Sequence, residues 1–385
     1  MTHILLDVTR IVTRLHDGLI PTGVDRVGLA YVHHYGQRAQ AVLSERGYSA
    51  VLTRRDSERL FDLLTAPPSP QRKWVIRRLV AKALMRSWGS WPATGATLLH
   101  TSHSGMEHVR YYEAMKRRNV RSVFMIHDLI PLTHAEYCRP GIEQMHRRRM
   151  HTALRHASGL IANSRDTLDA IVREAKAAKV PVPPIAVAHL APGIAARSLA
   201  PPLIEKPYFV MLGTIEPRKN HWMILHVWRS LVERHGTQAP KLVIVGRRGW
   251  ECENVIDMLE RCGPLRHSVI EESHCPDERL QSLLQHARAL LFPSFVEGYG
   301  MPLVEALASG IPVIASDLGV FREIASRIPD YLHPLDGPGW AEKIMSYVPP
   351  DSPTRKDQLS RIARFNAPTW DTHFACVDHF IDMLN

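Results

Sequence analysis

Two glutamates lie eight positions apart in residues 292–310, Phe-Pro-Ser-Phe-Val-Glu-Gly-Tyr-Gly-Met-Pro-Leu-Val-Glu-Ala-Leu-Ala-Ser-Gly. Glu297 precedes a Gly-x-Gly turn, and Glu305 lies in the short helix expected after it. The turn glycines, Gly298 and Gly300, allow a ligand to approach the main chain closely. The two carboxylates can therefore reach different hydroxyl-bearing parts of one ligand.

The start of that helix suits the diphosphate of an anionic sugar nucleotide. Free N–H groups of Gly300, Met301 and Leu303, together with the helix dipole, make a seat for phosphate, and we place Tyr299 in the same site. Glu297 is then expected on the sugar and Glu305 on the nucleotide ribose. The alternative is a helix N-terminus whose acids only complement the dipole.

This stretch resembles the E-x7-E signature of the retaining glycosyltransferases of family 4. Both acids, the Gly-x-Gly, the proline and the trailing Ser-Gly-Ile-Pro-Val-Ile-Ala-Ser-Asp follow in the order of that family. The resemblance implies an α/β protein of the GT-B fold, with two Rossmann-like domains facing each other across a cleft. It also implies a C-terminal helix that crosses back to the first domain.

A second motif follows the apolar strand expected at 208–212 and reads Gly-Thr-Ile-Glu-Pro-Arg-Lys-Asn-His. Gly213 permits close approach at a strand end, while Arg218 and Lys219 supply two cations for a diphosphate leaving group. The segment resembles the Gly-x5-Lys-Asn loop of the same family, which assigns both cations to the donor phosphates. The alternative is a chance basic pair in a basic protein.

A histidine and an aspartate, His127 and Asp128, end the apolar strand expected at 123–126, and they resemble a His-Asp motif of the family. The resemblance places His127 beside the transferred sugar. Its imidazole could donate a hydrogen bond to a sugar hydroxyl, and Asp128 could orient neighbouring groups.

Three further residues are candidates near the ligand. Gly23 and Arg26 lie in the loop expected at residues 18–26, before a helix at 27–38, although the family's usual Gly-Gly pair is missing. A turn with a helix cap is the alternative for this loop. Ser164 lies before an amphipathic helix and is explained equally well as its N-cap.

Strands alternate with helices along the whole chain, which predicts parallel sheets covered by helices. Four prolines between residues 192 and 207 indicate a linker. We therefore expect an acceptor-side domain at 1–195, a nucleotide-sugar-binding domain at 206–368 and a C-terminal helix at 369–385. An ordinary terminal helix is the alternative for the last segment.

Residues 71–91 are basic and rich in tryptophan, and no acid interrupts them. Prolines precede the segment, which suggests an insertion. The pattern predicts a helix in a membrane interface, with the apolar residues largely away from the basic face, or alternatively a solvated basic face over a core helix. The basic positions are Arg72, Lys73, Arg77, Arg78, Lys82 and Arg86.

The 385 residues carry a formal charge of +10, distributed as +14 over residues 1–200 and −4 over residues 201–385. The basic half lacks any nucleic-acid-binding motif, so we expect an anionic membrane or a lipid-diphosphate acceptor as partner and no nucleic acid. No apolar run or signal-like N-terminus is present, which predicts a cytoplasmic protein. Five scattered cysteines indicate neither disulfides nor zinc, and suggest core packing.

The chain contains no Asp-x-Asp, the pair that holds a divalent ion in metal-dependent glycosyltransferases, so we expect no metal and no cofactor. The sequence thus predicts transfer of a hexose from a nucleotide diphosphate sugar, first GDP-mannose, to a surface polysaccharide or polyprenyl-diphosphate-linked saccharide. The enzyme is expected to work at the inner face of the cytoplasmic membrane. The alternatives are a nucleotide-sugar epimerase of the same fold and a non-catalytic, membrane-associated nucleotide-sugar-binding protein.

Overall fold

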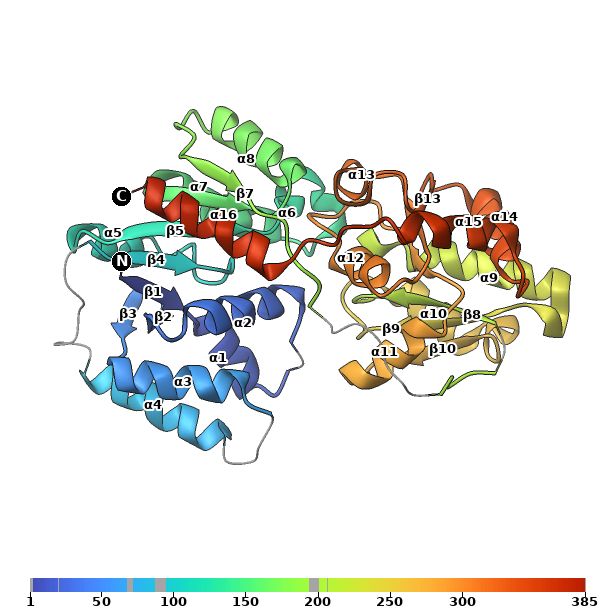
Figure 1. Cartoon of the computed structure of the whole chain (residues 1–385), viewed down its shortest axis with the longest axis horizontal. Coiled ribbons are helices and arrows are strands. Elements are labelled where there is room, and N and C mark those ends of the chain that lie inside the picture. The colour runs from blue at the N-terminus through green and yellow to red at the C-terminus, as the bar shows by residue number, and fades with distance from the viewer. Residues whose placement is uncertain are drawn as a thin grey trace. The chain divides into compact units, whose positions relative to one another are not determined.

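A computed structural model of the protein describes residues 3–19, 21–67, 72–86, 95–193, 201–205 and 207–384. The chain forms two compact units, each built around its own sheet (Figure 1). Unit 1 comprises residues 1–133, 141–190 and 368–385, and unit 2 comprises residues 134–140 and 191–367. Residues 134–140 therefore group with unit 2, although the sequence predicts them inside the first domain.

Unit 1 contains a seven-stranded sheet in the order β3-β2-β1-β4-β5-β6-β7. All neighbours are parallel except β2 and β3, which form an antiparallel pair at one edge. The strands are β1 Ile4–Asp7, β2 Ala39–Glu45, β3 Tyr48–Val51, β4 Thr97–His100, β5 Arg121–Ile126, β6 Ala157–Ala162 and β7 Ile185–Val187.

The helices of unit 1 pack apolar faces against this sheet. In α8, for example, Ser164 caps the N-terminus through its Oγ, which accepts the N–H of Thr167 at 3.0 Å, and Ala170 and Ile171 are buried. The helical elements are α1 Thr9–His16, α2 Gly23–Tyr35, α3 Arg54–Thr65, α4 Arg72–Arg86, α5 Val109–Arg117, α6 Ile130–Thr133, α7 Ile142–His156, α8 Arg165–Ala177 and α16 Trp370–Met383.

Unit 2 contains a six-stranded, wholly parallel sheet in the order β10-β9-β8-β11-β12-β13. Its central strands are continuous apolar runs, as expected for strands buried on both faces. The strands are β8 Tyr208–Leu212, β9 Lys241–Val245, β10 Val269–Glu272, β11 Leu290–Phe292, β12 Val313–Ser316 and β13 Asp330–Leu332.

Helices and short 3-10 turns connect these strands, and the core gathers around the buried rings of Trp228, Trp340 and Tyr347. One 3-10 turn, η1 Ala135–Tyr137, belongs to the segment that unit 2 takes from the first half of the chain. The other helices and 3-10 turns of unit 2 are η2 Pro217–Lys219, α9 His221–His235, η3 Gly236–Gln238, α10 Glu253–Arg261, η4 Gly263–Leu265, α11 Asp277–Gln285, α12 Met301–Ala308, α13 Gly319–Ala325, α14 Gly337–Tyr347 and α15 Pro353–Ile362.

The C-terminal helix α16 returns to unit 1, as the resemblance implies (Figure 1). Its His373 lies 3.1 Å from the hydroxyl of Tyr31, and its Phe374 stacks on His34 with ring centroids 4.0 Å apart. Five residues of the helix are buried against the unit, so this helix is an integral part of it.

The structure of residues 9–26 differs from the prediction. Helix α1 occupies residues 9–16, where no element is expected, and α2 begins at Gly23 rather than at residue 27. A capping box explains the early start, because the carboxylate of Asp25 accepts the N–H of Thr22 at 2.7 Å. The loop that we predict at residues 18–26 is therefore shorter, and Gly23 is helical.

The segment predicted as a membrane-interface helix forms α4, which lies beside α3 (Figure 1). Within α4, Ile76 and Leu79 are buried, whereas Trp74 is 63% exposed. Lys73, Arg77 and Arg78 share this exposed face, so the predicted separation of Trp74 from the basic residues is wrong. A residue every three to four positions suffices to anchor the helix, which leaves Trp74 outward.

Three of the basic residues of α4 with described side chains bond to other parts of unit 1. Arg72 donates to the carbonyl of Leu64 at 2.7 Å, Lys82 pairs with Asp56 at 2.7 Å, and Nε of the exposed Arg77 donates to Nε2 of His16 at 2.8 Å. Within the described side chains, the outward cations are Lys73, Arg77 and Arg78. The side chain of Arg86, and the predicted segment at 71 and 87–91, lie outside the described residues.

Two general predictions can be compared with the structure. No helix among the described residues combines the length and apolar character needed to cross a membrane. All five cysteines are free thiols; Cys252 is buried in the core of unit 2 and the partly buried Cys262 packs against that core, which agrees with the predicted packing role for these two.

Candidate active site

The two predicted motifs of unit 2 meet at one edge of its sheet. Strands β8 and β11 are parallel neighbours, so the loops at their carboxyl ends lie together, where ligands of such sheets bind. The N–H of Phe295 donates to the carbonyl of Arg218 at 2.9 Å. The amide of Asn220, which has left-handed backbone angles (φ 59°), donates to the carbonyl of Pro293 at 3.2 Å. These bonds hold the two loops together.

The charged side chains of these loops form a compact cluster. The carboxylate of Glu297 accepts from Nζ of Lys219 at 2.5 Å, from Nη1 of Arg218 at 2.7 Å and from Oγ of Ser294 at 2.8 Å. Nε of Arg218 also pairs with Oε1 of Glu216 at 2.6 Å. The structure thus brings Arg218, Lys219 and Glu297 together, as predicted for one ligand, but already paired with one another.

Burial acts differently on the two carboxyls of the cluster. Burial alone would raise the pKa of Glu297, but the charges of Arg218 and Lys219 lower that pKa to about 2. Burial raises the pKa of Glu216 above its ordinary value, and the lowering by Arg218 and Lys219 only partly offsets it. Glu297 is consequently a firm anion, whereas Glu216 is held less firmly in its charged form.

Two glycines are required by the backbone at this edge. Gly213 has φ +141°, and a Cβ there would lie 3.3 Å from Cε of Lys219. The glycine therefore leaves room for the Lys219 side chain at the end of the strand. Gly300 has φ +101°, and a Cβ there would lie 2.6 Å from the ring of Phe321. Both predicted glycines therefore shape the site directly.

The predicted phosphate seat at helix α12 needs one correction. The helix starts at Met301 with Gly300 as its N-cap, but the N–H of Leu303 donates to the carbonyl of Gly300 at 3.0 Å. Leu303 is therefore not a free donor, because the first turn closes on itself. In the part of the chain that the structure describes, the N–H groups of Gly300 and Met301 have no hydrogen-bond partner.

Other predicted members of this site are buried nearby. The ring of Tyr299 is 4% exposed. Oε1 of Glu305, inside α12, accepts the main-chain N–H of Gly193 at 3.2 Å. The residues that follow Gly193 toward position 200 lie outside the described part. The carboxylate predicted to bind a ribose thus meets the start of residues 191–367, within unit 2.

In unit 1, His127 follows β5 and is 7% exposed. Its Nε2 lies 2.8 Å from the carbonyl oxygen of Thr101, which can only accept, so this nitrogen carries the proton. Burial lowers its pKa, with Thr101, Asp128, Arg10 and Asp25 as further influences. The neutral ring therefore offers Nδ1 as an acceptor toward a sugar hydroxyl, in place of the donor that we predict.

The main chain of His127 is also held on both sides. Its N–H donates to Nε2 of His103 at 3.1 Å, and its carbonyl accepts from the amide of Asn163 at 2.8 Å. Burial and the neighbouring His146 and His127 hold the pKa of His103 well below its usual range. This arrangement fixes the position and tautomer of His127.

The remaining predicted residues of unit 1 have structural contacts. Asp128 accepts the N–H of Ile130 at 3.1 Å and so caps α6, and Ser164 is the fully buried N-cap of α8. Arg26 is half-buried on α2. These contacts account for Asp128 and Ser164 as helix caps.

Sequence reasoning missed several residues of both clusters. Asp25 is 2% exposed and pairs with Arg10 at 2.8 Å and with Arg14 at 2.6 Å, and its charge reaches His127. Glu216 and Ser294 were also missed. The signal for Glu216 is its place two residues before Arg218, inside the motif that we quote, and a carboxylate there was available to pair with the cations.

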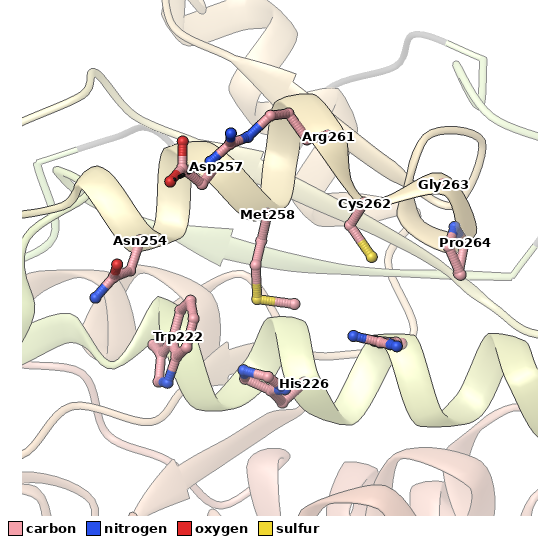
Figure 2. Close-up of a pocket in the computed structure, with 10 residues that line it drawn as sticks. Trp222, His226, Asn254, Asp257, Met258, Arg261, Cys262, Gly263 and Pro264 are labelled. Atoms are coloured by element: carbon pink, nitrogen blue, oxygen red, sulfur yellow. Dashed lines mark ion pairs between the residues drawn. The ribbon is translucent and has the colours of Figure 1, made fainter.

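A separate groove of about 430 Å³ lies between α9 and α10 (Figure 2). Trp222 and His226 line one side and Asp257, Met258 and Arg261 the other. Of the two arginines that line it, Arg261 is paired with Asp257 at 2.5 Å and Arg229 with Glu233 at 2.8 Å, so the groove does not offer the excess of cations that a diphosphate needs. None of the predicted site residues lines it.

Parts of the chain are similar to known glycosyltransferases. Residues 200–327 match the family model described as "Glycosyl transferases group 1". The chain is homologous to the serotype-specific mannosyltransferase WbdA of Escherichia coli, with 31% identity over 243 residues, which are 59% of this chain and 30% of that protein. The O-antigen chain mannosyltransferase B of Escherichia coli is 32% identical over 145 residues, 38% of each chain. The chain thus spans about a third of the length of these curated relatives.

The fold is shared with solved glycosyltransferase structures. The crystal structure of Anabaena Alr3699/HepE in complex with UDP and glucose superimposes with a TM-score of 0.68, covers 100% of both chains and is 15% identical in sequence. The predicted GT-B fold, with two Rossmann-like units and a returning C-terminal helix, is confirmed.

Proposed function

We propose that this chain is a retaining hexosyltransferase that uses a nucleotide diphosphate sugar, and its homology to mannosyltransferases together with its fold supports a glycosyltransferase activity. The cluster of Glu297, Arg218 and Lys219 at the carboxyl ends of β8 and β11 carries the proposal. Its two cations can stabilise the charge that grows on a leaving diphosphate, and Glu297 lies between them to meet the sugar. In unit 1, taken by itself, Nδ1 of His127 can accept a hydrogen bond from a hydroxyl group.

The first donor that we propose is GDP-mannose, and the acceptor is a hydroxyl of a surface polysaccharide or of a lipid-linked saccharide. The names of the relatives, a serotype-specific and an O-antigen chain mannosyltransferase, support this choice. The neighbour solved with UDP and glucose favours UDP-glucose as the alternative donor.

The test is incubation of the protein with GDP-mannose, UDP-glucose and related donors, with and without a lipid-linked mannosyl acceptor. A transferase releases nucleoside diphosphate and extends the acceptor, and NMR of the product gives the anomeric configuration. An epimerase changes the sugar without acceptor, and a binding protein raises the melting temperature without either reaction. Inversion of the anomeric configuration would contradict the retaining assignment.

Catalysis without a metal ion is the second part of the proposal. The absence of Asp-x-Asp from the sequence supports it, as do the two cations that the site already holds. Activity in excess EDTA should stay within about twofold of that in magnesium. Activity that disappears with EDTA and returns with magnesium or manganese would show that a metal takes part.

Attachment to an anionic membrane at its cytoplasmic face is the third part. The exposed face of α4 supports it, because an exposed tryptophan lies among three outward cations there. An aromatic ring at headgroup depth together with cations is the composition of interfacial helices. Such attachment would bring the site to a lipid-linked acceptor.

A further inference from the structure

The guanidinium of Arg218 is shared between two buried carboxylates. Its Nε pairs with Glu216 at 2.6 Å and its Nη1 with Glu297 at 2.7 Å, while Lys219 adds a second cation at 2.5 Å from Glu297. The side chains of Glu216 and Glu297 are 3% and 8% exposed. Two cations and two anions thus form a neutral cluster in which the charges already satisfy one another.

A diphosphate that enters this cluster brings at least two negative charges. Because Glu216 and Glu297 are buried, solvent and salt screen them poorly from the added charge. A nearby like charge favours the neutral form of a carboxyl. Either a carboxylate withdraws from Arg218 or it accepts a proton.

The two carboxylates differ in how firmly they are held. Glu297 has three partners, namely Arg218, Lys219 and Ser294. Among the described residues, Arg218 is the one partner of the Glu216 carboxylate. Since burial also favours the neutral form of Glu216, it is the carboxyl that yields.

The charged surroundings of Glu216 are few. Arg218, Lys219 and Glu297 act on it directly. Arg248 lies on the neighbouring loop, whose backbone pairs with Ile215, but its guanidinium turns to Glu260 and Glu271 at 2.5 and 2.9 Å. Arg247 beside it is exposed. The protonation of Glu216 therefore depends on the donor-site cluster itself.

We infer that Glu216 takes up one proton from solvent when the diphosphate of the donor binds, which frees Nε of Arg218 for a phosphate oxygen. Glu216 then acts as a positioning residue whose protonation couples donor affinity to pH. The inference rests on the proposed function only in taking a nucleoside diphosphate as the ligand.

The test is isothermal titration of GDP and of UDP into the full chain, in buffers of different ionisation enthalpy between pH 6 and 8. The dependence of the observed heat on that enthalpy counts the protons taken up. Wild-type protein should take up more protons than Glu216→Gln, by up to one, and its affinity should fall with rising pH by up to about tenfold per unit. The affinity of Glu216→Gln should change less, because only the protonation of the nucleotide phosphate remains.

The matched control is Glu233→Gln, which breaks an exposed carboxylate–arginine pair on α9 and should behave as wild type. Equal proton uptake by wild type and Glu216→Gln would overturn the inference, and so would wild-type binding without proton uptake, even if the variant fails to fold. Wild-type protein that binds neither GDP nor UDP would overturn both the inference and the proposed donor. Binding without proton uptake would leave the proposed function intact.

Discussion

Glu297 and Glu305 have different surroundings in the structure, which sharpens the roles proposed for them. Glu297 is paired with both cations, whereas Glu305, which lies inside α12, accepts the main-chain N–H of Gly193. Removing Glu297 leaves Arg218 and Lys219 without that anion, so their attraction for a diphosphate should be kept or increased. Removing Glu305 should instead reduce affinity for the nucleotide.

We therefore expect Glu297→Ala to bind the free nucleoside diphosphate at least as tightly as wild type while turnover falls at least 100-fold. Glu305→Ala should lose at least about tenfold in that affinity. Titration calorimetry and initial rates measure the two effects. Similar losses of nucleoside diphosphate affinity in both variants would show that the carboxylates do not divide the work.

Lys219 is the more deeply buried of the two cations, and its ammonium also lies 4.8 Å from the ring centre of Phe292. Lys219→Ala should lower kcat by about 10²–10³, the loss typical of one preorganised group that stabilises transition-state charge. The control is Lys241→Ala, which removes a half-buried lysine of the same unit whose ammonium donates to the carbonyl of His267 at 2.7 Å. A kcat within threefold of wild type would remove Lys219 from the mechanism.

At the scale of elements, α4 has a core-facing side and an outward basic side. Arg72 and Lys82 are engaged with unit 1, so the outward cations Lys73, Arg77 and Arg78 should provide the attraction to anionic lipid. At about 1 kcal/mol for each, their replacement by glutamine should weaken vesicle binding by about 100-fold.

Co-sedimentation with vesicles of increasing phosphatidylserine content measures this effect, and binding should fall as salt is added. The control variant carries Arg234→Gln, Arg266→Gln and Arg364→Gln, three exposed positions of unit 2 with the same loss of charge. If both triple variants bind alike, α4 is not the docking surface.

Helix α16 is held to unit 1 by aromatic contacts, and Phe374 is 4% exposed among Tyr31, His34 and Tyr35. Phe374→Ala should lower the free energy of unfolding of this unit by about 3–5 kcal/mol, as expected when a buried aromatic ring is removed. Asp378→Asn, which changes the partly exposed ion pair between this helix and Arg38, should cost at most about 1 kcal/mol. Urea unfolding checks both, and equal costs would mean that the ring does not anchor the helix.

At the scale of the whole molecule, each unit contains a histidine that burial keeps neutral. Burial lowers the pKa of His221 in unit 2 to about 3 and that of His373 in unit 1 to about 4. The unfolded chain, with a histidine pKa of about 6.5, binds protons more readily. Stability conferred by these groups is therefore present above about pH 6.5 and is lost as the pH falls toward 4 and then 3.

We expect each group to contribute up to about 1.4 kcal/mol of lost stability per pH unit below about 6. Both ring nitrogens of His221 are buried and have no hydrogen-bond partner among the described residues, so His221→Leu should reduce the acid sensitivity of unit 2. The control exchanges His235, at the exposed end of the same helix, for leucine. Urea midpoints at pH 7.5, 6 and 5 check this, and parallel pH profiles for wild type and His221→Leu would contradict it.

The distribution of charged and apolar residues along the sequence predicts part of the fold. A continuous apolar run predicted β8 at its observed bounds, because strands buried on both faces need no polar alternation. Strands β2, β3 and β4, and helix α1, were missed. The antiparallel pair β2–β3 depends on an edge pairing that local pattern does not reveal, and the residue directly before α1, Val8, is not a capping residue.

The sequence by itself determined the fold class and the residue types of the donor site, because turns, caps and apolar runs are local and family motifs keep their order along the chain. Tertiary structure decided which charges meet. Glu216 and Ser294 are local neighbours of Arg218 and Glu297, but the two pairs form one cluster only because β8 and β11 are neighbours in the sheet, and His103 reaches His127 because β4 and β5 are neighbours. The protonation of His127 and the neutral pairing of Arg218 likewise depend on burial and on partners far along the chain, and no local pattern encodes either.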